Sequence, residues 1–338
     1  MILVTGGLGY LGSHIALDLM SRGHEVVLVD NLSQSSMPML ERLEYNTNLY
    51  IPFIRMDVRN TPVLQKVFEQ YPIDYVIHTA GFKSVNESVL RPLDYYNNNQ
   101  GCLMSVLRAM QRSGVKRLVN LSSAMVYGQS GEKFKEDDEF HVKHQNPYVR
   151  AQQQNEQILH DVFRADDYWQ ISNLRLSNVV GAYTDSKIGE WVAPLPKSVL
   201  LNILQVAAQQ RDIFELYHQD LDTQDGSSER DFIHVMDVVN AVYKLMIWSN
   251  NQQNFLENFN LGSSQLTSIL QLIQQVETVT KANITQQPYP EITEEFAQVG
   301  INIEKIQQTI DWKPEQDLAQ AITDQWNFYQ KSLGLVDH

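Results

Sequence analysis

Along the first half of the chain, short apolar runs alternate with longer stretches in which apolar residues recur every three or four positions. The short runs predict buried strands, and the longer stretches predict helices that pack one face against them. The predicted strands are Ile2–Thr5, Val26–Val29, Phe53–Met56, Tyr75–His78, Leu118–Ser122 and Ile171–Leu176. The predicted helices are Leu11–Arg22, Pro62–Tyr71, Pro92–Arg112 and Tyr148–Arg164. This alternation predicts an α/β fold with a doubly wound parallel sheet of the Rossmann type.

The pattern loosens after about residue 177, which predicts a second and smaller α/β domain. A strand followed by a helix is then expected over Ile233–Ser249, where the pattern of the first half resumes. We therefore predict a first domain of residues 1–176, to which residues 233–260 return. The smaller domain is expected to consist of residues 177–232 and 261–338.

A glycine-rich segment follows the first predicted strand and opens the first predicted helix. It reads TGGLGYLG over Thr5–Gly12, and this context matches the fingerprint of dinucleotide-binding folds. Gly6 permits the tight turn, Gly9 lets the backbone approach a pyrophosphate, and Gly12 allows the helix to pack closely on the strand. The helix N-terminus then offers free N–H groups and the positive end of its dipole to the phosphates.

An acidic residue, Asp30, ends the second predicted strand. It is placed to accept hydrogen bonds from the adenosine ribose, and its charge would repel the 2′-phosphate of NADP. We therefore predict that the cofactor is NAD. Asp57, after the third predicted strand, could reach the adenine edge, or it could act only as a helix cap or turn residue.

Composition and charge exclude several other classes of protein. With 43% hydrophobic residues and 20% charged residues, the 338-residue chain can bury a sizeable core. A net charge of −14 argues against partners such as nucleic acids or acidic membranes. No run approaches the roughly 18 apolar residues of a membrane helix. The only cysteine, Cys102, permits no internal disulfide and is consistent with a cytoplasmic protein. No spacing of His, Cys, Asp and Glu suggests a metal site, and His78 and His234 are expected to be core residues.

Several short motifs, in a fixed order, resemble those of the UDP-glucose 4-epimerase family of extended short-chain dehydrogenases/reductases. They are TGGLGYLGSH at the start, VDNL at Val29–Leu32, AGFKSVNESV at Ala80–Val89, PLDYYNNN at Pro92–Asn99, SSAMVYG at Ser122–Gly128, NPY at Asn146–Tyr148 and RDFIHVMD at Arg230–Asp237. The resemblance implies a reaction in which the C4 hydroxyl of a UDP-hexose loses its proton while hydride passes from C4 to NAD. The hydride then returns to the opposite face of the 4-keto sugar.

The resemblance also implies roles for individual residues. Tyr148 would be the catalytic base, with Ser123 as its hydroxyl partner. The cofactor would be bound by Gly6, Gly9, Tyr10, Leu11, Gly12, Asp30, Asn31, Asp57, Val58, Thr79, Ala80, Gly81, Lys83, Asn98, Ser122, Tyr148 and Gln152. The substrate would be bound by Ser123, Asn178, Ser198 and Arg230. A homodimer is expected to form through the helices Pro92–Arg112 and Tyr148–Arg164. The apolar Leu103, Val106, Leu107 and Met110 could serve either that interface or the domain's own sheet.

The family's nucleotide-sugar dehydratase neighbours carry an Asp-Glu pair after the Ser or Thr of the fifth strand. Here those positions are Ala124 and Met125, which cannot move protons, so dehydration is disfavoured. Lys83 could instead be a solvated loop lysine, and Arg230 could be an ion-pair partner of Asp231.

The chain departs from the family at the catalytic helix. In the family, a lysine one helical turn after the tyrosine lowers the tyrosine pKa and binds the nicotinamide ribose, but here that position is Gln152. Arg150 would point away from the face of Tyr148. An unperturbed tyrosine has a pKa of about 10, so we expect catalysis roughly 10²–10⁴-fold slower than in a lysine-bearing relative.

The substrate half departs as well. The late loop Gln286–Gly300, where the family places a diphosphate-binding arginine, has no Lys or Arg and contains Glu291, Glu294 and Glu295. These departures leave a second hypothesis open, a non-catalytic NAD(H)-binding protein that acts as a sensor or partner subunit. A third is a reductase or other short-chain activity on a different substrate.

Overall fold

The computed structural model of the chain describes residues 1–141, 146–190, 198–289 and 296–334. The chain forms two compact units, each built from separate stretches of sequence. The first comprises Met1–Val126, Gln145–Arg175 and Val239–Phe259. The second comprises Tyr127–His144, Leu176–Val238 and Asn260–His338.

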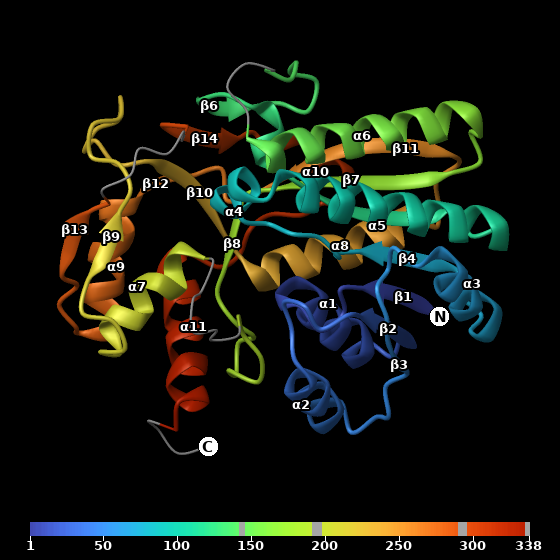
Figure 1. Cartoon of the computed structure of the whole chain (residues 1–338), viewed down its shortest axis with the longest axis horizontal. Coiled ribbons are helices and arrows are strands. Elements are labelled where there is room, and N and C mark those ends of the chain that lie inside the picture. Colours follow the sequence, from blue (N-terminus) through green and yellow to red (C-terminus); the bar gives the residue numbers. More distant parts are fainter. Residues whose placement is uncertain (142–145, 191–197, 290–295, 335–338) are drawn as a thin grey trace. The chain divides into compact units, whose positions relative to one another are not determined.

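The first unit is built on a seven-stranded sheet (Figure 1). Its strand order is β11-β7-β5-β4-β1-β2-β3, so the chain crosses over between non-consecutive neighbours, as in a doubly wound fold. The strands are β1 (Ile2–Thr5), β2 (Val26–Asp30), β3 (Phe53–Arg55), β4 (Tyr75–His78), β5 (Arg117–Ser123), β7 (Gln170–Leu176) and β11 (Phe255–Leu261). At the centre, Ile2 of β1 pairs in parallel with Val26 of β2 and with Tyr75 of β4. The predicted α/β class with a Rossmann-type sheet is confirmed.

Helices connect these strands, and three of them begin at a side-chain cap. They are α1 (Tyr10–Ser21), α2 (Met37–Thr47), α3 (Thr61–Gln70), α4 (Val85–Leu90), α5 (Pro92–Ser113), α6 (Pro147–Ala165) and α8 (Val235–Ser249), whose first residues belong to the second unit. The side chains of Asn60, Ser84 and Asn146 cap α3, α4 and α6. α5 ends at Gly114, whose φ of 71° is the left-handed conformation that glycine adopts readily.

The core of the first unit lies between its sheet and its helices. Leu103, Val106, Leu107 and Met110 of α5 are at most 5% exposed and pack in this core with strand residues such as Val76. The four residues left open between core and dimer interface therefore belong to the core. The outer face of α5 carries other residues, and α6 packs alongside α5 (Figure 1).

The second unit contains a sheet of five strands and a separate pair. The larger sheet has the order β12-β10-β14-β6, with β8 also paired to β10, and the pair is β13-β9. Its strands are β6 (Gly131–Phe134), β8 (Asn178–Val180), β9 (Phe214–Leu216), β10 (Glu229–His234), β12 (Leu266–Ser268), β13 (Gln286–Pro288) and β14 (Gln298–Ile301). Its helices are α7 (Val199–Ala207), α9 (Ile269–Thr280), α10 (Glu304–Ile310) and α11 (Leu318–Ser332). Apolar residues of α7, α9 and α11 pack together in its core.

Two features differ from the sequence analysis. Helices α2 and α4 were not predicted, because each is short or weakly apolar and flanked by polar residues. The chain also returns to the first unit at a later residue than the predicted residue 233. β10 pairs inside the second sheet, the first unit resumes at Val239 within α8, and the strand that returns to the first sheet is β11. The assignment of the second unit to substrate binding stays a prediction.

Within the described residues, no helix has both the length and the apolar character required to cross a membrane. The described residues also contain no cluster of His, Cys, Asp and Glu that could hold a metal ion.

Candidate active site

The glycine-rich segment forms a tight turn between β1 and α1. Gly6 has a φ of 66°, which favours glycine, and Gly9 is the N-cap of α1. A Cβ on Gly12 would lie 2.2 Å from the carbonyl oxygen of Gly6, so no other residue fits there without moving the turn. The turn therefore packs directly against the first turn of α1, and a helix N-terminus of this kind offers free N–H groups to a phosphate.

Asp30 joins this turn to the loop that follows β2. Its Oδ2 accepts a hydrogen bond from the Leu8 N–H at 3.1 Å, and its Oδ1 accepts from the Leu32 N–H and the Ser35 hydroxyl, both at 2.8 Å. The side chain is buried at 7% exposure. The carboxylate thus lies beside the glycine turn, where the sequence analysis placed it.

The ends of β3 and β4 bring further predicted cofactor residues to the same edge of the sheet. Asp57 accepts a hydrogen bond from Arg59 Nη2 at 2.6 Å, and the Arg59 guanidinium holds the pKa of the Asp57 carboxyl below its usual range. The Asn31 side chain lowers the pKa of Asp57 further. Val58 is buried, and Thr79 Oγ1 donates to the Thr5 carbonyl at 2.7 Å.

The loop after β4 leads into α4 and α5. Ala80 is half-buried and Gly81 is exposed. The ammonium group of Lys83, which is exposed, lies 5.8 Å from the centre of the Tyr10 ring, so it reaches back over the start of α1. Asn98 is buried and donates to Asn99 Oδ1 at 3.1 Å.

Tyr148 and Ser123 lie near each other, and the Ser123 hydroxyl lowers the pKa of Tyr148. Ser123 is the last residue of β5, and Tyr148 is the second residue of α6, which Asn146 caps. Burial raises the pKa of Tyr148, and the nearby Ser123 hydroxyl partly offsets that shift. The structure therefore brings together the two residues that the sequence analysis paired, in the same unit as the glycine turn.

Gln152 lies one helical turn after Tyr148 and shares its face of α6. It is 9% exposed, and its Oε1 accepts a hydrogen bond from Asn155 Nδ2 at 3.4 Å. Arg150 is exposed to solvent, as its position on the helix predicted. No charged group on α6 thus takes the place of a lysine beside Tyr148.

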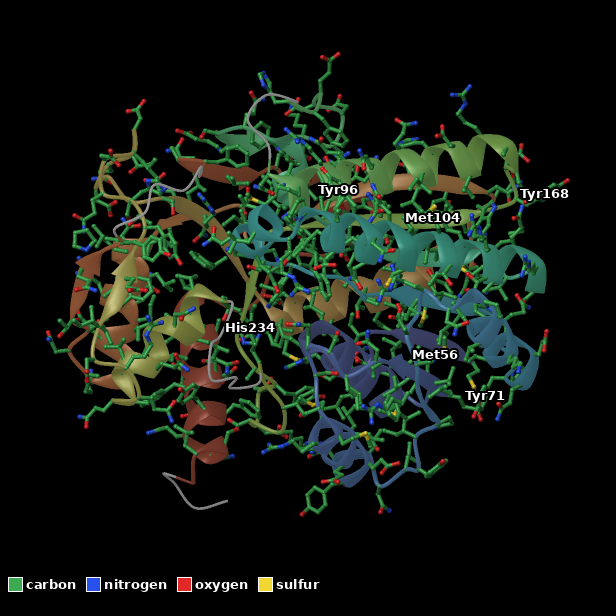
Figure 2. All side chains as sticks on the ribbon, in the orientation of Figure 1. Met56, Tyr71, Tyr96, Met104, Tyr168 and His234 are labelled. Carbon is green, nitrogen blue, oxygen red and sulfur yellow. The ribbon has the colours of Figure 1, made fainter. Side chains whose placement is uncertain are left out.

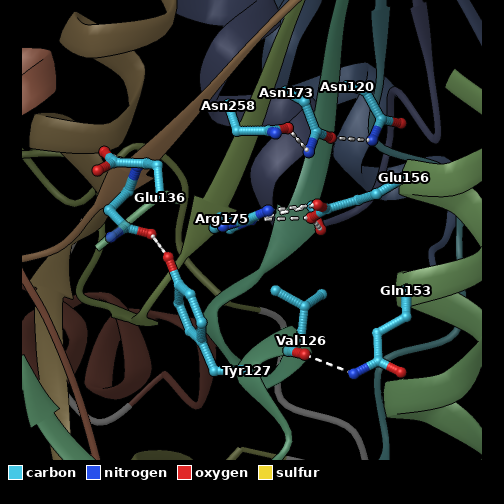
Figure 3. A network of polar contacts seen from close by, with 11 residues as sticks. Asn120, Val126, Tyr127, Glu136, Gln153, Glu156, Asn173, Arg175 and Asn258 are labelled. Atoms are coloured by element: carbon cyan, nitrogen blue, oxygen red, sulfur yellow. Dashed lines mark hydrogen bonds and ion pairs between the residues drawn. The ribbon is translucent and has the colours of Figure 1, made fainter. Parts of the chain in front are cut away.

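A buried polar network lies one turn further along α6 (Figure 3). Ser122 Oγ donates to Glu156 Oε1 at 2.6 Å, and Glu156 pairs with Arg175 of β7. The Ser122 side chain is therefore directed at Glu156, and its hydroxyl proton is already used there. Sequence reasoning missed Glu156, although its spacing of four from Gln152 placed it on the same face of the helix.

The predicted substrate residues lie in the second unit. Asn178 is exposed on β8, beside Phe232 of β10 in the parallel register. Arg230, also on β10, is 5% exposed and donates to the carbonyl of Glu229 at 2.8 Å. Ser198 caps α7 by accepting a hydrogen bond from the Leu201 N–H at 3.4 Å.

Asp231, the residue after Arg230, accepts hydrogen bonds from the N–H groups of Ser263 and Ser264. Glu291, Glu294 and Glu295 of the late loop lie outside the described residues.

His78 and His234 are core residues, as predicted. His78 is 5% exposed and its Nδ1 lies 2.7 Å from Thr5 Oγ1. Burial lowers the pKa of His78 to about 4, so the ring is neutral at physiological pH. His234 accepts from the Met236 N–H through Nδ1, and its Nε2 therefore donates to Asp324 at 3.1 Å.

Comparison with known proteins agrees with this arrangement. The model of a family described as the NAD-dependent epimerase/dehydratase family matches residues 2–262. A UDP-glucose 4-epimerase of Neisseria meningitidis serogroup C is 36% identical over 328 residues, which cover 97% of this chain and 96% of the relative. This chain belongs to the NAD-dependent epimerase/dehydratase family.

Solved structures extend the likeness of this epimerase-family chain to its fold. A UDP-glucose 4-epimerase from Bifidobacterium longum, in complex with NAD⁺ and UDP, has a TM-score of 0.94 at 32% identity and covers 98% of both chains. Another from Stenotrophomonas maltophila, with bound NAD and formylated UDP-arabinopyranose, has a TM-score of 0.92 at 32% identity and covers 99% of both. By family, the chain is an epimerase-like isomerase that depends on NAD.

The family includes both epimerases and dehydratases, and the residues after Ser123 bear on the difference. Ala124 and Met125 begin a short 3₁₀ helix, and Ala124 is 3% exposed. Neither side chain can donate or accept a proton. The hydroxyl group of Ser123, at the end of β5, can do both.

Proposed function

We propose that this chain is a nucleotide-sugar 4-epimerase that uses NAD and interconverts UDP-hexoses at C4. The observation that carries the proposal is the pairing of Tyr148 with the nearby Ser123 hydroxyl, in the unit that also holds the glycine turn. The relatives named above support the choice of substrate class, since each is a UDP-glucose 4-epimerase.

The first unit fits NAD. Gly6 and Gly12 let the turn pack closely against the start of α1, which Gly9 caps, and Asp30 lies beside them to accept hydrogen bonds from a ribose. The other predicted cofactor residues lie mainly at the ends of β3 and β4, on α5 and on α6. When bound, NAD would accept a hydride from C4 of the sugar and return it.

Tyr148 would act as the general base toward the C4 hydroxyl. Its burial keeps its proton transfer away from bulk water, and the Ser123 hydroxyl is placed to stabilise the tyrosinate that forms. When the sugar is reduced again on its opposite face, Tyr148 would return the proton. Both residues would therefore contact the reacting hydroxyl group directly.

Gln152 weakens this chemistry, according to the same proposal. Burial raises the pKa of Tyr148, and the uncharged Gln152 cannot oppose that effect as an ammonium group would. The base is then protonated in most molecules at neutral pH. We expect turnover on the order of 10²–10⁴-fold slower than with a lysine at position 152.

The second unit would bind the nucleotide sugar. Arg230 is its predicted diphosphate ligand, and Asn178 and Ser198 are predicted to contact the sugar or its nucleotide. Since the chain carries a net charge of −14, an anionic substrate requires such a local positive charge. A cytoplasmic location and a homodimer stay predictions of the sequence.

Gln152 also favours a second candidate function. A chain that binds NAD but lacks a charged partner for its base could serve as a non-catalytic sensor or partner subunit. The intact pair of Tyr148 and Ser123 supports the enzyme instead, because the epimerase reaction requires a group that exchanges a proton with the C4 hydroxyl.

The deciding experiment measures conversion of UDP-galactose to UDP-glucose by the purified chain with added NAD, beside Gln152→Lys and Tyr148→Phe. We expect slow turnover by the wild type, faster turnover by Gln152→Lys, and turnover reduced by at least about 10²-fold in Tyr148→Phe. If neither the wild type nor Gln152→Lys turns over while both bind NAD, the non-catalytic function is the correct one.

A further inference from the structure

We infer that Asn155 is a positioning residue that turns the side-chain amide of Gln152 so that its NH₂ group, not its oxygen, faces the cofactor site. This inference rests on the proposed NAD site and adds a residue that neither the motifs nor the resemblance singled out. In this orientation, Gln152 presents hydrogen-bond donors to the cofactor site, as the ammonium group of a lysine would.

The orientation follows from a series of hydrogen bonds that begins at a group that can only accept. The backbone carbonyl oxygen of Asn99, in α5, can only accept a hydrogen bond. Asn155 of α6 contacts this oxygen at 3.4 Å, so the contacting atom must be its NH₂ nitrogen, Nδ2. The same Nδ2 also contacts Gln152 at 3.4 Å, and the contacting atom there must therefore be the oxygen Oε1. The NH₂ group of Gln152 then points away from Asn155.

The opposite orientation of Asn155 is unfavourable. It would place Oδ1 against the Asn99 carbonyl, two acceptors facing each other without a proton between them. In the observed orientation, Oδ1 is buried, and within the described residues it has no hydrogen-bond partner. The fold thus leaves one buried acceptor unpaired in order to keep the donor of Asn155 between Asn99 and Gln152.

Asn99, where this series of hydrogen bonds begins, is itself held in place. The Asn99 side chain accepts from the Phe82 N–H at 2.8 Å and donates to the Phe82 carbonyl at 3.0 Å, which ties α5 to the loop that carries Lys83. Asn155 and Gln152 are buried at 7% and 9% exposure. Burial limits the rotation of both amides, so the orientation set at Asn99 is transmitted to Gln152.

Among the described residues, no hydrogen-bond partner is found for Gln152 Nε2. Because Gln152 and Tyr148 are one turn apart on the same face of α6, this NH₂ group is available to a ligand that lies beside Tyr148. A ribose hydroxyl offers the acceptor lone pairs that this donor requires. With the amide reversed, the glutamine oxygen could bind only a hydroxyl proton, and the contact would resemble that of lysine less closely.

The test is a double-mutant cycle on NADH affinity, measured by fluorescence titration of the full chain. Asn155→Asp keeps the size of the side chain but offers only acceptors, so the Gln152 NH₂ group would turn toward residue 155. We expect NADH binding about 10-fold weaker in Asn155→Asp, and less than about 2-fold weaker when the same change is made in Gln152→Met. A second cycle with Asn155→Leu introduces no new charge, and it provides the test by itself if Asn155→Asp does not fold.

The two outcomes are separable. Equal losses of affinity in the wild-type and Gln152→Met backgrounds would mean that Asn155 acts without Gln152, and would overturn this inference while leaving NADH binding intact. A wild-type chain that binds no NADH overturns the proposed function, and this inference with it.

Discussion

Glu156 and Arg175 carry opposite charges in the interior of the first unit, where their side chains are 2% and 3% exposed. Arg175 Nη2 lies 2.8 Å from Glu156 Oε2 (Figure 3). Ser122 donates to the other carboxylate oxygen. The pair links β7 to α6 one helical turn from Gln152. It therefore holds the helix that carries Tyr148 against the sheet.

We expect Glu156→Gln to lower the free energy of unfolding by about 3–5 kcal/mol, because it leaves the Arg175 charge buried without a counter-charge. Urea unfolding followed by circular dichroism measures the change. Asp161→Asn removes an exposed carboxylate from the same helix and should change stability by less than about 0.5 kcal/mol. A loss below about 1 kcal/mol in Glu156→Gln would show that water reaches Arg175.

Catalysis should depend on pH through Tyr148. Burial raises the pKa of Tyr148, so the deprotonated base becomes more populated as pH increases, and kcat should rise from neutral to alkaline pH. A cation at position 152 favours the tyrosinate, so Gln152→Lys should move this rise to lower pH and increase kcat at neutral pH by roughly 10²–10⁴-fold.

The matched control places the same charge on the solvent side of the same helix. Gln157 is exposed, so Gln157→Lys should leave the pH profile unchanged. Identical pH profiles for the wild type and Gln152→Lys would show that Tyr148 is not the group whose ionisation limits turnover.

The sequence predicted much of the first unit because its central strands, β1, β2 and β4, are buried at every position and read as short apolar runs. Tyr75–His78, for example, is buried at every position, and such a run reads as a strand without further context. The glycine turn was predictable for a similar reason, since backbone φ at Gly6 and the contact at Gly12 limit which residues fit.

The polar contacts around Gln152 were not predictable to the same degree. Asn155, Glu156 and Arg175 are ordinary polar residues in the sequence, and their importance depends on burial and on partners far away along the chain. The spacing of Glu156 from Gln152 indicates a shared helix face, but no local pattern indicates that Asn99 lies opposite Asn155. Only tertiary structure brings those amides together.

Asp30 should set the preference for NAD over NADP. Its carboxylate beside the glycine turn would form charge-assisted hydrogen bonds with ribose hydroxyls and repel a 2′-phosphate. Asp30→Asn should weaken NAD binding about 10- to 150-fold and narrow the preference over NADP, measured for both cofactors by calorimetry. Asp161→Asn is again the control, since it removes the same charge far along α6. A wild-type chain that binds both cofactors equally would contradict this role.

The predicted homodimer can be tested on the outer face of α5. Leu93 and Met104 are 81% and 37% exposed, and they lie on the same face of the helix, three turns apart. Met104 is labelled on α5 in Figure 2, and on the same helix Gln100 is hydrogen-bonded to Gln154 of α6.

If α5 and α6 form the interface, Leu93→Asp combined with Met104→Asp should shift the chain from dimer to monomer in sedimentation-velocity experiments, because both carboxylates would be buried unpaired. Tyr45, on α2, is 87% exposed, and Tyr45→Asp should leave the mass unchanged. A wild-type chain that sediments as a monomer would refute the prediction, and a dimer that survives the double substitution would place the interface elsewhere.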